Sequence, residues 1–120
     1  MAGTQWVRVD VGYLRNPKVQ RVGRNGALLH LAAILYLGEH RIDSGLLPPE
    51  ALPFVALDAG VRRTEPVIAD LVECGLWHPS TKGGFVIHDY SETNGSASEA
   101  SAARDRKRRW RERGTQDGHA

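Results

Sequence analysis

The fold is decided by the stretch Thr64-Glu65-Pro66-Val67-Ile68-Ala69-Asp70-Leu71-Val72-Glu73-Cys74-Gly75-Leu76-Trp77. Thr64 is a favoured N-cap residue, and Pro66 falls in the first turn, where its missing N–H is least costly. One apolar face recurs at helical spacing and comprises Val67, Ile68, Leu71 and Val72. Gly75 suits the left-handed residue that ends many helices. The stretch therefore predicts a helix over 64–74 that leads directly into a strand at Leu76-Trp77.

A β-hairpin is predicted immediately after this helix. Residues 78–84 contain Pro79 and the pair Gly83-Gly84, a composition typical of a turn. Phe85-Val86-Ile87-His88 then provides a second strand. Upstream, Asp43-Ser44-Gly45 predicts a turn and Leu46-Leu47 a short strand.

Three more helical segments are predicted before residue 64. Asn16-Pro17 favours the start of a short helix over 17–22, which Gly23 should end. Asn25 can cap a second helix over 26–40, whose apolar residues cover most of its circumference and predict a central position in the core. A third helix should end at Ala59-Gly60, with Pro53 in its first turn. Residues 6–13 nearly alternate apolar and polar side chains, a pattern that favours a strand.

The charge of the chain is concentrated near its C-terminus. Residues 104–113 hold seven of the 16 Lys and Arg residues and two of the 14 Asp and Glu residues, a net charge of +5 in a chain of +2. Clustered cations bind polyanions because phosphate counterions are released. On an ideal helix, Arg104, Lys107, Arg108 and Arg111 would share one face. The Ser96–Glu99 capping box predicts a helix over 97–113, with so little apolar surface that it would be mobile until it meets a partner.

The predicted fold class is α+β, mainly α: helices with a C-terminal β-hairpin wing, followed by a basic tail that can form a helix. We expect a domain over 1–90, a Ser/Ala-rich linker over 91–103, and a basic tail with a polar C-terminus over 104–120. The order of the elements and the Gly75-Leu76-Trp77 exit from the last helix resemble winged helix-turn-helix domains.

Residues 6–90 with the basic tail are similar to the N-terminal domain of replication-initiation or replisome-organiser proteins of actinobacterial phages and mobile elements. The resemblance rests on Trp6-Val7, Asn16-Pro17-Lys18-Val19, Asp43-Ser44-Gly45, residues 71–77 and Val86-Ile87-His88-Asp89-Tyr90. In such domains the third core helix often enters the major groove of DNA. Here that helix is 64–74, which lacks Lys and Arg. Its predicted outward residues are Glu65, Ala69, Asp70 and Glu73, and carboxylates repel phosphates, so the helix could equally pack or bind protein.

The predicted function is therefore DNA binding, mainly through phosphate contacts, in replication initiation or transcriptional control. The alternatives are a protein-interaction or oligomerisation module of a replisome, acting as a homodimer or with another replisome protein, and RNA binding through the Arg-rich tail. Trp110 could stack on an unpaired base or dock on protein. The predicted nucleic-acid-binding residues are Arg62, Arg63, Thr64, Lys82, Arg104, Arg106, Lys107, Arg108, Arg109, Trp110, Arg111 and Arg113.

Catalytic, metal and membrane chemistry are not predicted. Cys74, His78 and His88 are too few and too irregularly spaced for a zinc site. His30 is expected to be a hydrogen-bonded core residue. We expect no enzymatic activity and no cofactor, because neither a nucleophile–base set nor a phosphate-binding loop is present. The longest apolar run, Ala27–Leu37, is too short to cross a bilayer, and the N-terminus lacks a signal pattern, so a cytoplasmic location is expected.

Overall fold

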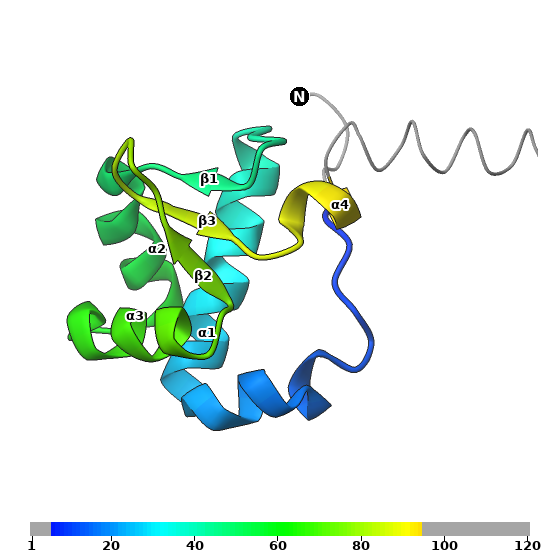
Figure 1. Ribbon diagram of the computed structural model, residues 1–120, viewed down its shortest axis with the longest axis vertical. Coiled ribbons are helices and arrows are strands. Elements are labelled where there is room, and N and C mark those ends of the chain that lie inside the picture. Colours follow the sequence, from blue (N-terminus) through cyan, green and yellow to red (C-terminus); the bar gives the residue numbers. More distant parts are fainter. Residues whose placement is uncertain (1–5, 95–120) are drawn as a thin grey trace, which may run out of the picture.

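The protein is built around one long helix that packs against two shorter helices and a small sheet (Figure 1). The computed structural model describes residues 6–94; the basic segment 104–113 and the helix expected over 97–113 lie outside them. The three main helices are α1 (Pro17–Glu39), α2 (Leu52–Ala59) and α3 (Thr64–Glu73). The strands are β1 (Leu46–Leu47), β2 (Trp77–Pro79) and β3 (Phe85–Ile87). Single helical turns form η1 (Tyr13–Arg15), η2 (Pro49–Ala51) and α4 (Tyr90–Asn94).

The predicted α+β class with a dominant helical part is confirmed, and so is the hairpin. The sheet is antiparallel with the order β1-β3-β2, so β3 is the central strand. Trp77 pairs with Ile87 across the hairpin, and Leu46 pairs with Val86 on the other side of β3. The short strand predicted at Leu46-Leu47 therefore becomes the third strand of the same sheet.

Helix α1 joins the two helices predicted over 17–22 and 26–40. The Asn16 side chain accepts a hydrogen bond from the Lys18 N–H and caps the helix, as the sequence predicted. Gly23 has the non-helical angles φ 72° and ψ −170°, so α1 consists of two helical segments that meet at a kink, and the predicted interruption at Gly23 is confirmed. Helical geometry resumes after Gly23, and the second segment brings Leu29, Ala33 and Leu37 into the core.

The strand predicted over residues 6–13 is wrong. The Asp10 carboxylate accepts a hydrogen bond from the Gly12 N–H at 2.6 Å, and the Asp10 carbonyl accepts one from the Tyr13 N–H at 3.0 Å. These bonds form a turn that leads into η1 and stops any extended run. The segment packs on α1 instead, where the Tyr13 hydroxyl donates to the Ala27 carbonyl at 2.5 Å.

Helix α3 begins at Thr64, but Thr64 is not the N-cap residue that the sequence predicted. Thr64 is its first helical residue, while Arg63 occupies the N-cap position without a side-chain capping bond. The predicted boundaries at the other ends are confirmed: Gly60 closes α2 with φ 71°, and Gly75 follows α3 with φ 84°. Both glycines take the left-handed conformation that favours glycine.

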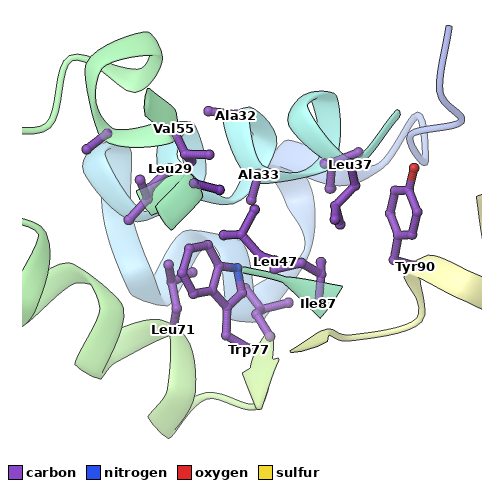
Figure 2. Close-up of a cluster of buried hydrophobic side chains, with 14 of the residues drawn as sticks. Leu29, Ala32, Ala33, Leu37, Leu47, Val55, Leu71, Trp77, Ile87 and Tyr90 are labelled. Carbon is purple, nitrogen blue, oxygen red and sulfur yellow. The ribbon is translucent and has the colours of Figure 1, made fainter. Parts of the chain in front are cut away.

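One hydrophobic core joins all the main elements, as predicted. Figure 2 shows Trp77 beneath α1, surrounded by Leu29, Ala33, Leu47 and Leu71, with Ile87 beside it. Tyr90 lies at the edge of this cluster. The members with no exposed side-chain surface are Leu29, Ala33, Leu37, Leu47, Ala51, Val55, Leu71 and Trp77.

His30 is the buried polar residue of this core. Its Nδ1 accepts a hydrogen bond from the Trp77 indole N–H at 3.0 Å, which confirms the expected core histidine. The Tyr13 ring stacks on the His30 imidazole with centroids 5.8 Å apart. Burial lowers the pKa of His30 from 6.5 to about 4, with a smaller contribution from the charge of His88, so His30 is neutral at pH 7.

No helix within residues 6–94 has both the length and the apolar character that a membrane crossing requires.

Truncation of Leu71 should strongly destabilise the domain. The side chain is completely buried, so Leu71→Ala should lower the free energy of unfolding by about 2–5 kcal/mol through lost burial and the cavity left behind. The measurement is urea denaturation at low protein concentration. Leu57→Ala is the matched control: this leucine is 78% exposed, and its truncation should change stability by no more than about 0.5 kcal/mol. Equal effects of the two substitutions would contradict this core.

Acidification should destabilise the domain through His30. Above pH 6.5 the imidazole is neutral in both states; between pH 6.5 and about 4 only the unfolded chain binds the proton. The free energy of unfolding should therefore fall as the pH falls through this window, by on the order of 3 kcal/mol. His30→Gln keeps an acceptor for the Trp77 N–H, and the glutamine side chain does not bind a proton in this pH range. Urea denaturation at each pH gives the free energy of unfolding of the wild type and of the variant, and the difference between the two values isolates the contribution of His30. If the two free energies change in parallel with pH, this expectation is refuted.

Candidate nucleic-acid interface

Arg62 and Arg63 lie in the connection between α2 and α3, and Thr64 follows them as the first residue of α3. Val61 is buried and fixes this connection to the core, which leaves the next two arginines exposed. With Glu65 and Pro66 the three residues line an open hollow of about 480 Å³. The structure thus brings together three of the residues predicted to contact nucleic acid.

The hollow coincides with the N-terminus of α3. No side chain caps this end, so the first N–H groups of the helix remain available, and they carry the positive end of the helix dipole. A phosphate could contact these N–H groups and the two arginine side chains together. Glu65 is exposed in the same first turn and opposes such an anion.

The outward face of α3 is acidic. Glu65, Ala69, Asp70 and Glu73 are exposed, as predicted, while Leu71 points into the core. Helix α3 contains three carboxylates and no cation, so its surface is unsuited to deep insertion between phosphate ridges.

Lys82 is exposed at the tip of the β2–β3 hairpin. The Ser80 side chain accepts from the Lys82 N–H at 3.2 Å and shapes the turn. The same turn packs against η2, because a Cβ on Gly83 would lie 3.1 Å from Pro49 Cγ. The β2–β3 turn, which contains Lys82, therefore lies beside the start of α2, whereas the connection that contains Arg62 and Arg63 follows its end (Figure 1). The eight residues of α2, about 12 Å of helix, separate the two cationic positions.

A second group of cations was missed by the sequence reasoning. Arg15, Lys18, Arg21 and Arg24, which we call the α1 cation row, recur every third residue on η1 and the first turns of α1. Residues 8–24 hold five basic and one acidic side chain, net +4, whereas residues 25–94 hold four basic and nine acidic, net −5. A count of charge along the N-terminal segment would have revealed this row, which the larger basic cluster at 104–113 obscured.

Two members of the row lie against the C-terminal end of α3. Arg21 forms an exposed ion pair with Glu73 at 3.3 Å. Lys18 Nζ lies 3.7 Å from the position that a Cβ would take at Gly75, near the negative end of the α3 dipole. These contacts join the first part of α1 to α3. The exposed ion pair contributes about 1 kcal/mol or less to the stability of the fold.

The described chain ends beside its own N-terminal segment. The Asn94 side chain accepts from the Arg8 N–H at 2.5 Å and donates to the Arg8 carbonyl at 3.0 Å. Helix α4 thus covers four residues, 91–94, of the segment predicted as a linker. The remaining predicted contacts, Arg104 to Arg113 with Trp110, lie outside the described residues.

Of the three residues considered for zinc, the structure brings two together. His78 Nε2 and His88 Nδ1 are 3.0 Å apart across the hairpin, and His88 Nε2 lies 3.3 Å from the Asp89 carboxylate. Cys74 instead directs its thiol to the Leu71 carbonyl at 3.5 Å. In the range 6–94, no three His, Cys, Asp or Glu side chains are grouped so that they could hold a metal ion.

Comparison of the chain with protein-family models, with curated proteins and with solved structures found no match. The candidate interface is therefore defined by its own geometry and charge.

Proposed function

We propose that this protein binds duplex DNA mainly through phosphate contacts, with the Arg-rich segment 104–113 as the principal contributor. The observation that carries the proposal is charge segregation: a segment of net +5 is attached to a chain whose residues 25–94 have a net charge of −5. Such a segment attracts phosphates, while the acidic surface keeps the rest of the domain from lying flat on them. The proposed role is binding, and no catalytic step is part of it.

We further propose that the fold is a winged helix-turn-helix domain. The order of α1, β1, α2, α3 and the β2–β3 hairpin supports this assignment, as does the pairing of β1 with β3. On this reading α3 is the equivalent of a recognition helix and the hairpin is the wing. Replication initiation or transcriptional control in a phage or mobile element is the role that follows from the resemblance.

The acidic face of α3 sets the proposed mode of binding. Because Glu65, Asp70 and Glu73 are exposed, α3 is expected to stay outside the major groove. Arg62, Arg63 and the uncapped start of α3 can hold one phosphate, and Lys82 can reach another at the far end of α2. Binding should therefore depend on salt and discriminate little between base sequences.

A protein-interaction role is the second candidate, because exposed carboxylates on α3 and exposed apolar side chains on α1 and α2 are also typical of a surface that contacts protein. In that case the basic tail would be auxiliary. RNA remains a third candidate through the tail alone, because Arg-rich segments can fold on RNA.

Salt titration tests the proposal. If four to six cations contact duplex phosphates, log K against log salt should have a slope of roughly −3.6 to −5.4. Replacing Arg104, Lys107, Arg108 and Arg111 by Ala should flatten this slope and weaken binding to all sequences similarly. Fluorescence anisotropy with duplexes of several sequences measures both quantities.

The control for this titration keeps the charge. Replacing Arg104, Arg108 and Arg111 by Lys should preserve most of the slope, because the counterion term depends on charge rather than on the guanidinium geometry. Arg62→Ala with Arg63→Ala should reduce the slope less than the four-residue replacement. If the four-residue alanine variant keeps the wild-type affinity and slope, the tail is not the DNA site and the protein-interaction role becomes the better explanation.

Parallel titrations with single-stranded DNA and RNA separate the remaining candidates. Trp110→Ala should leave duplex binding almost unchanged and weaken binding to unpaired bases if the indole stacks on them. Tighter binding to RNA than to duplex DNA at equal salt would favour the third candidate.

A further inference from the structure

An apolar groove lies between the N-terminal segment and α1. It has a volume of about 710 Å³ and is lined mainly by Val9, Tyr13, Leu14, Ala27, Leu28 and Leu31. Leu14 is 71% exposed and Leu28 39% exposed, so both present apolar surface to solvent. The hydrogen bond from the Tyr13 hydroxyl to the Ala27 carbonyl holds the two walls together, so the groove is already formed in the free chain.

The charged residue at the rim of this groove is a cation, because Arg24 is the one charged side chain among the residues that line it. A suitable occupant therefore offers apolar side chains flanked by carboxylates. The chain's own tail does not fit this description, because its single large apolar residue, Trp110, lies between Arg109 and Arg111. A bare phosphate backbone would match the rim but not the apolar floor.

A surface of the required chemistry exists on α2. Phe54 is 62% exposed and Leu57 is 78% exposed, one helical turn apart. Asp58 follows Leu57 in α2 and Glu50 lies in η2 immediately before the helix, and both carboxylates are exposed, so the chain carries one on each side of the apolar pair. At 3.6 residues per turn, Phe54, Leu57 and Asp58 share one face of the helix. We call these four residues the α2 ridge.

We propose that the α2 ridge of one copy of this protein binds the apolar groove of a second copy. Apolar side chains and charge signs are complementary between the two surfaces. Figure 1 shows α2 and the N-terminal segment on opposite sides of α1, so the ridge cannot reach the groove of its own chain. A contact between two different patches leaves one free groove and one free ridge on every dimer. Association of this kind is head-to-tail, and it continues into open chains or closes into a ring larger than a dimer.

The contact should be weak and dependent on concentration. Two exposed anchors and a shallow groove are less than a standard protein–protein interface provides, so dissociation constants in the micromolar range or weaker are expected. The inference does not depend on DNA binding, because neither the ridge nor the apolar floor of the groove belongs to the proposed phosphate contacts.

Sedimentation velocity of the full chain tests this proposal, after nuclease treatment and across concentrations from micromolar to near millimolar. The wild type should form species larger than a dimer as concentration rises. Leu28→Glu disables the groove and Leu57→Glu disables the ridge, and each should lower the association constant by about tenfold or more. Leu35→Glu is the matched control, because Leu35 is an exposed leucine of α1 that lines neither surface. Circular dichroism should show that all three variants fold.

A mixture of the two variants is the decisive arm. The Leu28→Glu chain keeps its ridge and the Leu57→Glu chain keeps its groove, so together they should form a one-to-one dimer that cannot grow further. A wild type that stays monomeric at every concentration overturns the proposal and points to a different partner. A mixture that stays monomeric overturns it in favour of a symmetric contact. Loss of association in the control, or after nuclease treatment alone, also overturns it.

Discussion

The position of Trp77 under α1 is the constraint on which the other elements depend. Its side chain has no exposed surface, and its indole N–H donates to His30 in the middle of α1. Trp77 is also the first residue of β2, two residues after the glycine that follows α3. The orientation of the indole therefore fixes the exit from α3, the start of the hairpin and the face of α1 that points inward.

The buried hydrogen bond explains why this core accepts a histidine. An indole N–H without a partner would lose a hydrogen bond to water, and a neutral imidazole can replace it without bringing a charge into the core. Tyr13 stacks on the face of the imidazole, and its hydroxyl donates a hydrogen bond to the Ala27 carbonyl. The polar contact thus links the N-terminal segment, α1 and the sheet, three parts of the chain that are remote in sequence.

Charged side chains and exposed apolar side chains are concentrated in different regions of the molecule. The α1 cation row and the carboxylates of α3 partly neutralise each other, which leaves the start of α3 as the cationic part of that helix surface. The apolar floor of the groove and the α2 ridge lie outside this region, whereas Arg24 belongs both to the α1 cation row and to the groove lining. If weak self-association and weak phosphate binding act on the same DNA, each raises the effective concentration of the other, so an assembled row of copies would bind far more tightly than one copy.

Local chemistry in the sequence determined the helices, the hairpin and part of the site. Asn16 with Pro17, Gly60 and Gly75 mark helix ends through short-range bonds and left-handed conformations, and such signals are present in the residues themselves. Helical periodicity predicted the acidic outward face of α3. The proximity of Arg62 and Arg63 follows directly from their being consecutive in the sequence. The tertiary structure alone decided how β1 joins β3, that His30 receives the Trp77 N–H, and that residues 6–13 form a turn and a groove wall instead of a strand. It also decided that Lys82 and the arginine pair lie at opposite ends of α2. These outcomes depend on contacts between residues far apart in the chain, where the free energy of packing selects among arrangements that local preferences leave equivalent.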